Sequence, residues 1–124
     1  VEGNFFGTIP GSKAAVLQMK KQAKGIIVNI LSVSALTGRA LSSGYCASKF
    51  GAMGFTKSIR MELADDNITI VGVYPGGMKT EIFKAKPPAD YENYMEPSYV
   101  AAKILENLTA EQIDEEQIIA LPKY

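Results

Sequence analysis

The pattern of apolar and polar positions divides the chain into alternating helix-like and strand-like segments. Small residues recur every four positions at the start, with apolar residues around them and lysines at the end, which predicts a helix over 2–24, bent at Pro10. Nearly continuous apolar runs at 26–31 and 68–74 predict strands buried on both faces of a parallel sheet. Helically spaced apolar residues between them predict a second helix over 44–65.

The remainder of the chain adds two loops, a third helix and a last strand. Residues 32–43 are rich in serine and glycine, and residues 78–96 contain adjacent prolines, so both segments are predicted to be loops. Pro97, near a first helical turn, predicts a helix that ends at Leu108, and residues 117–121 predict a short strand.

This order of elements predicts an α/β fold. Helices between strands favour a parallel sheet with helical crossovers, and three parallel strands alone would leave a buried type of strand at an open edge. We therefore expect part of a doubly wound, Rossmann-like parallel sheet with flanking helices, with residues 1–124 as a single partial domain. Each helical glycine costs about 1 kcal/mol relative to alanine, so Gly11, Gly51 and Gly54 predict close approach of another element.

Composition excludes several classes of function. Because the net charge is zero and the two signs are interspersed, we expect no nucleic-acid partner. One cysteine and no histidine disfavour a disulfide framework and a zinc site, and we expect no metal. The sequence contains no apolar run of about twenty residues, so we expect no membrane span and a soluble, cytoplasmic protein. Val1 is not an initiator methionine, and the chain has the pattern of one entered partway through a fold.

Candidate chemistry lies at the start of the second predicted helix. Tyr45 and Lys49 are four residues apart, so they share one helical face. A lysine charge at about 5 Å, with an effective dielectric constant of about 20, stabilises a phenolate by roughly 3 kcal/mol. Such a pair can exchange a proton near neutral pH, as a general acid or base must. The pair alone favours a plain helix start that carries an exposed lysine.

Four ordered segments give this sequence a stronger signature. Asn4-Phe5-Phe6-Gly7 is similar to an Asn-x-x-Gly motif, and Gly25 to Ser32 is similar to a strand that leads to an active-site serine. Tyr45 to Lys49 matches Tyr-x-Ala-Ser-Lys, and Pro75-Gly76-Gly77-Met78-Lys79-Thr80 matches Pro-Gly-x-x-x-Thr. Ser32 stands thirteen positions before Tyr45. In these features the chain resembles the short-chain dehydrogenase/reductase family over nearly its whole length.

The resemblance implies hydride transfer between a nicotinamide coenzyme, NAD or NADP, and a carbonyl or alcohol. It implies that Tyr45 is the general acid/base and that Lys49 tunes Tyr45 and binds the nicotinamide ribose. It further implies that Ser32 binds the substrate oxygen and that Asn4 holds a water of a proton relay. The cofactor-binding residues that it implies are Tyr45, Lys49, Pro75, Gly76, Met78 and Thr80.

Two departures from the family pattern are visible. Leu31 replaces the first of two paired serines, a change from which we expect little consequence. The sequence contains no Gly-x-x-x-Gly-x-Gly or Gly-x-Gly-x-x-Gly motif, so the turn that binds a pyrophosphate is missing. In the resembling family, the acidic or basic residue that selects between NAD and NADP lies in the same half as this turn, which the sequence lacks.

Alternatives remain open at several positions. Asn4 and Thr80 are also typical helix caps, Ser32 is a common loop residue, and Cys46 is compatible with inert packing. A non-catalytic dimerisation subunit or fragment of the same fold is the alternative function. Sugar-nucleotide epimerases share Tyr-x-x-x-Lys, but the turn at Pro75 and the short C-terminal part favour a simpler dehydrogenase.

The predicted partners are a small carbonyl or alcohol substrate and a second copy of the chain. Apolar residues in the two predicted loops favour an apolar or mixed substrate. These residues are Val33, Leu36, Leu41, Ile82, Phe83, Tyr91, Tyr94 and Met95. Helices 2–24 and 44–65 pair across a two-fold axis in the resembling family, which implies a homodimer or homotetramer.

Overall fold

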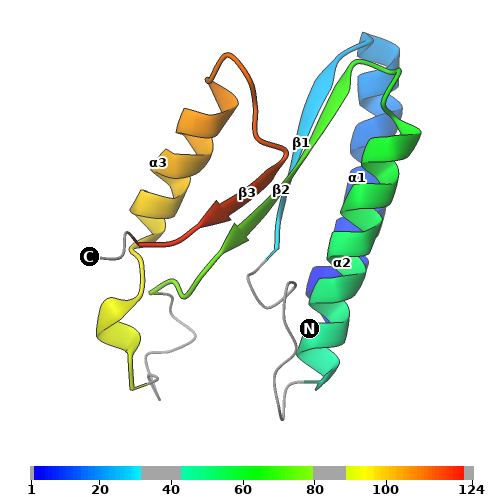
Figure 1. Ribbon diagram of the computed structural model, residues 1–124. Helices are drawn as coiled ribbons and strands as arrows, with labels where there is room; N and C mark the ends of the chain where they lie inside the picture. Colours follow the sequence, from blue (N-terminus) through cyan, green and yellow to red (C-terminus); the bar gives the residue numbers. More distant parts are fainter. Residues whose placement is uncertain (1, 32–42, 80–88, 122–124) are drawn as a thin grey trace.

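Three parallel strands form the middle layer of the structure, with two helices on one face and one on the other (Figure 1). The computed structural model describes residues 2–31, 43–79 and 89–121, and the side chains among them from residue 11 onward. The α/β class, the Rossmann-like parallel sheet and the flanking helices predicted from the sequence are thereby confirmed.

The predicted elements are confirmed in type and order, with ends shifted by a few residues. The helices and strands are α1 (Glu2–Gln22), β1 (Gly25–Ile30), α2 (Ser43–Glu62), β2 (Ile68–Pro75), the short 3-10 helix η3 (Tyr91–Asn93), α3 (Pro97–Leu108) and β3 (Glu116–Ile119). Helix α1 continues through Pro10 as one helix.

The central strand β2 is buried on both faces, as predicted. Alternate side chains of a strand point to opposite faces, so Ile68 and Ile70 pack against α1 and α2, while Val71 and Val73 pack against α3. Ile70, Val71 and Val73 have no exposed surface. This strand therefore fixes the position of all three helices relative to the sheet.

The edge strand β1 departs from the prediction that it is buried on both faces. Ile27 is buried under α1 and α2, but Ile26 and Ile30 are 45% and 48% exposed. Ile26 and Ile30 point to the face of the sheet that carries α3, and α3 covers β2 and β3 instead (Figure 1). The apolar run predicted the strand correctly, but not its position at the edge of this sheet.

The helical glycines only partly follow their prediction. A Cβ atom added at Gly11 or Gly54 would meet nothing within 4 Å in the described part of the chain, so the expected close approach is wrong at both positions there. Ala52, between the other small residues of α2, is 3% exposed and lies in the core. No helix in the described ranges is long and apolar enough to cross a membrane.

Candidate active site

Strand β1 and helix α2 bring the candidate active-site segments to one edge of the sheet. The carboxyl end of β1 and the amino ends of α1 and α2 lie at the lower edge in Figure 1. Ligands of doubly wound folds bind outside the carboxyl ends of the strands. The start of α2 therefore lies where a ligand of this fold is expected.

Tyr45 and Lys49 lie together in the first turns of α2. The Lys49 Nζ atom is 5.6 Å from the centroid of the Tyr45 ring. Lys49 is 8% exposed, whereas Tyr45 is partly exposed. The structure therefore has an ammonium beside a phenol that solvent or a ligand can reach, as the spacing of four predicts.

The turn after β2 is held by a backbone hydrogen bond to β3 and by packing against Tyr94. Pro75 ends the strand, and the Gly76 N–H donates to the Ile119 carbonyl oxygen of β3 at 3.0 Å. Gly77 packs directly under an aromatic ring, because an added Cβ would lie 2.8 Å from three ring atoms of Tyr94. A glycine is therefore required at position 77 unless Tyr94 moves.

The segment 78–96, predicted to be a loop with little regular structure, contains the short 3-10 helix η3 and a β-bridge between its two ends. Met78 and Met95 form a parallel bridge, in which the Lys79 N–H donates to the Met95 carbonyl oxygen and the Met95 N–H donates to the Gly77 carbonyl oxygen, both at 2.8 Å. In such a bridge the backbone groups of Met78 itself point away from Met95. Their orientation is compatible with the predicted backbone contact to a carboxamide.

The remaining predicted residues are not placed by the structure. Asn4 belongs to the first turn of α1, and its side chain is outside the described part. Ser32 and Thr80 lie outside the described residues altogether, as do Val33, Leu36, Leu41, Ile82 and Phe83.

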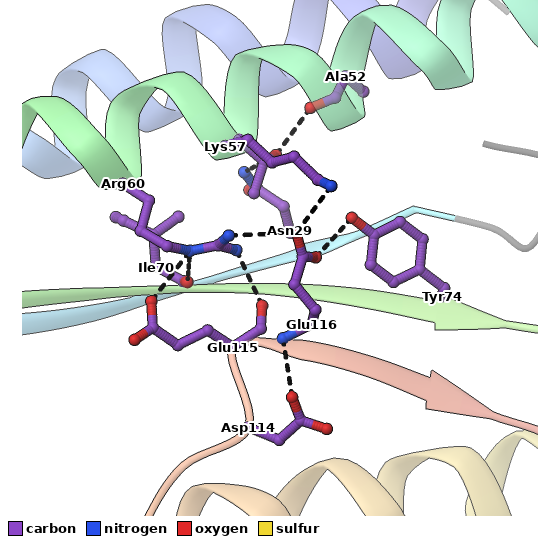
Figure 2. A network of polar contacts seen from close by, with 10 residues as sticks. Asn29, Ala52, Lys57, Arg60, Ile70, Tyr74, Asp114, Glu115 and Glu116 are labelled. Atoms are coloured by element: carbon purple, nitrogen blue, oxygen red, sulfur yellow. Dashed lines mark hydrogen bonds and ion pairs between the residues drawn. The ribbon is translucent and has the colours of Figure 1, made fainter. Parts of the chain in front are cut away.

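A polar network that the sequence analysis missed joins α2 to β2 and β3 (Figure 2). The Arg60 Nε–H donates to the Ile70 carbonyl oxygen at 2.9 Å, and a second guanidinium nitrogen donates to the Glu115 carbonyl oxygen at 2.8 Å. Arg60 also pairs with the carboxylates of Glu115 and Glu116, at 3.0 and 3.2 Å. Lys57 lies 3.4 Å from the Glu116 carboxylate.

Glu116 is also the acceptor for Tyr74, whose O–H donates to Oε2 at 2.6 Å. Burial, followed by the hydrogen bond and the charge of Glu116, raises the pKa of the Tyr74 phenol well above its ordinary value. Burial alone would raise the pKa of Glu116, but hydrogen bonds from Tyr74 and Arg60 and nearby positive charges lower it overall. Tyr74 is therefore a permanent donor and Glu116 a permanent acceptor near neutral pH.

A second polar contact, partly buried, joins β1 to α2. The Asn29 Nδ2–H donates to the Thr56 hydroxyl at 2.9 Å, and that hydroxyl donates to the Ala52 carbonyl oxygen at 2.7 Å. Thr56 has no exposed surface. Thr56 is seven residues after Lys49, so both residues face the sheet from the same side of the helix.

Comparison with known proteins identifies the family. Residues 1–91 match the family model described as short chain dehydrogenase. The chain belongs to the short-chain dehydrogenase/reductase family. A 3alpha-hydroxysteroid dehydrogenase of Mediterraneibacter gnavus is 42% identical over 89 residues, which are 72% of this chain and 36% of that protein. A 3-oxoacyl-[acyl-carrier-protein] reductase of Synechocystis is 34% identical over 110 residues, 84% of this chain and 44% of that protein.

Solved structures of short-chain dehydrogenases have the same architecture. A short chain dehydrogenase from Burkholderia cenocepacia in complex with NADP superposes with a TM-score of 0.80 at 28% identity, over 97% of this chain and 48% of that one. A 4-hydroxyisoleucine dehydrogenase complexed with NADH gives a TM-score of 0.76 at 25% identity, over 94% of this chain and 54% of that one. The chain thus spans about half the length of these neighbours.

The described residues fit one end of a nicotinamide coenzyme. A phenol, a buried ammonium and a turn with outward backbone groups are suitable partners for a ribose hydroxyl and a carboxamide. The glycine-rich turn that would receive the pyrophosphate is missing from the 124 residues. The fit is therefore to the nicotinamide half alone.

Proposed function

We propose that this chain is the catalytic half of an NAD(P)-dependent oxidoreductase that interconverts a carbonyl and an alcohol by hydride transfer. The observation that carries the proposal is the Tyr45–Lys49 pair, with the ammonium 5.6 Å from the centre of the phenol ring, in a member of this family. The coenzyme, when bound, supplies the hydride chemistry, and the protein supplies an oriented acid/base and binding groups.

Tyr45 is the proposed general acid/base. In reduction its hydroxyl gives a proton to the carbonyl oxygen, and in oxidation its phenolate accepts the proton of the alcohol. Lys49 stabilises the phenolate by its charge and binds the nicotinamide ribose. Ser32 hydrogen-bonds the substrate oxygen, and Asn4 holds a water that passes protons between Lys49 and solvent.

The coenzyme contacts are proposed at the turn after β2 and at the start of α2. Pro75 and Gly76 set the course of the turn, and the Met78 backbone and Thr80 hydroxyl contact the carboxamide. Two structural neighbours contain NADP and NADH respectively, which supports a coenzyme of this type. Because the residues that choose between NAD and NADP are absent from the sequence, both coenzymes belong in the assay.

The substrate is proposed to be an apolar or mixed carbonyl compound or alcohol. Tyr91 and Tyr94, with ring centroids 5.7 Å apart, follow the turn and offer aromatic surface near it. The relatives include proteins named as hydroxysteroid dehydrogenases, which supports this class. A relative named as a 3-oxoacyl-[acyl-carrier-protein] reductase makes acyl-carrier substrates the necessary comparison.

A homodimer or homotetramer through α1 and α2 is proposed for the same protein. The outer faces of α1 and α2 expose apolar side chains, with Leu17 67% and Met61 79% exposed. A groove of about 380 Å³ lies between the two helices and is lined partly by Val16, Leu17 and Phe55.

The cytoplasmic location expected from the sequence and the single partial domain over 1–124 stay predictions.

The test is turnover by the full-length polypeptide that contains this chain, with its length established by intact mass. NADH and NADPH oxidation are followed with steroid ketones, small aliphatic ketones, a sugar phosphate and a 3-oxoacyl carrier substrate. We expect reduction of one or more apolar ketones, and its loss in Lys49→Met. Turnover of the sugar phosphate or the acyl-carrier substrate alone would overturn the substrate class. A protein that turns over none of them and still dimerises would support the non-catalytic alternative.

A further inference from the structure

One buried side chain lies where the three segments of the candidate active site meet. The Tyr74 ring is 2% exposed and forms one core cluster with Leu31 and Ala52. Leu31 directly precedes Ser32, Ala52 lies one turn after Lys49, and Tyr74 itself directly precedes the Pro75 turn. Leu31, the residue that departs from the paired serines of the family pattern, is therefore part of the packing at this junction.

The hydroxyl of Tyr74 is fixed at the opposite end of the ring. It donates to Glu116 Oε2 at 2.6 Å, and Arg60 and Lys57 hold the Glu116 carboxylate from α2 (Figure 2). The bond packs closely against the backbone of Gly72. A Cβ added at Gly72 would lie 3.0 Å from the same Glu116 oxygen and 3.2 Å from the Tyr74 hydroxyl.

The bond therefore connects the strand before the Pro75 turn to the helix that carries Tyr45 and Lys49. Arg60 and Lys57 belong to α2, and Glu116 belongs to β3, whose Ile119 carbonyl oxygen accepts from Gly76. The turn-bearing strand and the catalytic helix are thus tied to one carboxylate. The network is partly buried, with the Arg60 and Glu116 side chains 21% and 35% exposed, and polar networks whose members are all paired favour a single arrangement of the groups that they join.

We propose that Tyr74 is a positioning residue, whose hydroxyl bond to Glu116 sets the Pro75–Met78 turn against the Tyr45–Lys49 pair. This inference rests on the proposed function. Tyr74 does not reach a reacting atom, because its ring is enclosed and its hydroxyl is directed at Glu116. It acts through the segments that it contacts, so its removal alters the reacting geometry more than the affinity for substrate.

The test compares Tyr74→Phe with Tyr99→Phe in the full-length protein. Both changes remove one phenol hydroxyl, and the Tyr99 hydroxyl, which lies 3.5 Å from the Ala120 carbonyl oxygen at an exposed position, is outside the network. A misplacement of about 1 Å can cost up to about a hundredfold in rate. We expect Tyr74→Phe to lower kcat about tenfold with substrate KM changed less than about twofold, and Tyr99→Phe to leave both unchanged.

A second pair of variants separates the hydrogen bond from general stability. Glu116→Gln keeps an oxygen that can accept from Tyr74 but turns its amide N–H₂ toward Arg60 and Lys57, whereas Glu116→Leu removes both acceptor oxygens. We expect kcat to fall about tenfold in Glu116→Leu and less than that in Glu116→Gln, with no further fall when Tyr74→Phe is added to Glu116→Leu.

The outcomes distinguish this inference from the proposed function. If wild type is active, Tyr45→Phe is inactive and Tyr74→Phe keeps full kcat, the positioning role is wrong while the function stands. A loss in Tyr74→Phe that appears only in KM, or an equal loss in Tyr99→Phe, would also overturn the positioning role. A folded wild-type protein that turns over no substrate in the panel would overturn both.

Discussion

At the scale of single residues, the predictable parts of the site are those that are close in sequence. Tyr45 and Lys49 are four positions apart on one helix, so helical geometry by itself predicts that they lie together. Tyr74 and Glu116 are 42 positions apart, and neither belongs to a local motif. Their contact depends on the register of β2 against β3, in which Gly72 is the partner of Glu116, and no local pattern encodes that register.

The contact between Asn29 and the buried Thr56 hydroxyl gives a first prediction at this scale. Thr56→Val keeps the shape of the side chain but leaves the Asn29 amide without its acceptor. Because Asn29 is only partly buried, we expect the free energy of unfolding to fall by about 1 kcal/mol, the lower end of the cost of an unpaired buried polar group. Chemical denaturation of the full-length protein measures this change.

Thr109→Val is the matched control. The Thr109 hydroxyl bonds to the Leu105 carbonyl oxygen in the same way, but at an exposed position. We expect a change within about 0.5 kcal/mol there. An equal loss of unfolding free energy in the two variants would show that the hydrogen bond from Asn29 to Thr56 does not contribute to stability.

Glu116 gives a second prediction, on the dependence of stability on pH. The pKa of Glu116 is lowered by folding, so its contribution is complete above its ordinary pKa of 4.5 and is lost as pH falls through the folded value. We expect Glu116→Gln to lower the free energy of unfolding by roughly 1–2 kcal/mol at pH 7, since hydrogen bonds to charged groups have about this strength. Because Glu116 is partly exposed, solvent screening makes the lower figure the better expectation.

Unfolding measured from pH 7 to acid pH checks the sign. The difference between wild type and Glu116→Gln should shrink below about pH 4.5. A difference that is constant over this range, or that grows on acidification, would contradict the assigned ionisation of Glu116.

At the scale of elements, the sequence pattern predicted the α-helices and strands of the described residues in type and order, but not the short 3-10 helix η3 within the predicted loop 78–96. It predicted burial less well, because burial depends on which element lies opposite. The run at 26–31 has the composition of a strand covered on both sides, yet Ile26 and Ile30 are exposed at the edge of the sheet. The glycines of α1 and α2 likewise indicated contacts that no described part of this chain supplies at Gly11 and Gly54.

The end of α1 gives an element-scale prediction. Ala23 has φ of 58°, a left-handed conformation that costs a residue with a Cβ about 1 kcal/mol or more. Asn67, at φ of 54° before β2, adopts the same conformation with a residue type that tolerates it, and its side chain donates to the Ala23 carbonyl oxygen. We therefore expect Ala23→Gly to raise the free energy of unfolding by about 0.5–1 kcal/mol.

Ala14→Gly is the control for Ala23→Gly. Ala14 is exposed within α1, where the same substitution should lower the free energy of unfolding by about 1 kcal/mol. Thermal or chemical denaturation of the two variants should give shifts of opposite sign. Destabilisation of similar size in both would contradict the strained conformation of Ala23.

At the scale of the whole molecule, the chain has one continuous sheet whose active-site edge is assembled from α1, α2 and the turn after β2. The family assignment accounts for this arrangement. The chain matches about half of each neighbouring structure, and β1 lies at the edge of the sheet that it forms. Tyr45, Lys49 and the turn from Pro75 to Met78, which are proposed to contact the nicotinamide side of a coenzyme, are among the described residues, whereas the sequence has no pyrophosphate turn. The proposed activity therefore belongs to the full-length protein.

The most direct test of the proposed function is the kcat of Tyr45→Phe in the full-length protein. It tests the proposed role of Tyr45 as the general acid/base of a nicotinamide-dependent oxidoreductase. General acid–base groups contribute about 10²–10⁴ in rate, so we expect kcat to fall by at least a hundredfold. The coenzyme dissociation constant, measured by titration, should change less than about threefold, because the ring and Lys49 remain. A Tyr45→Phe protein that binds coenzyme and keeps most of its kcat would show that Tyr45 is not the acid/base.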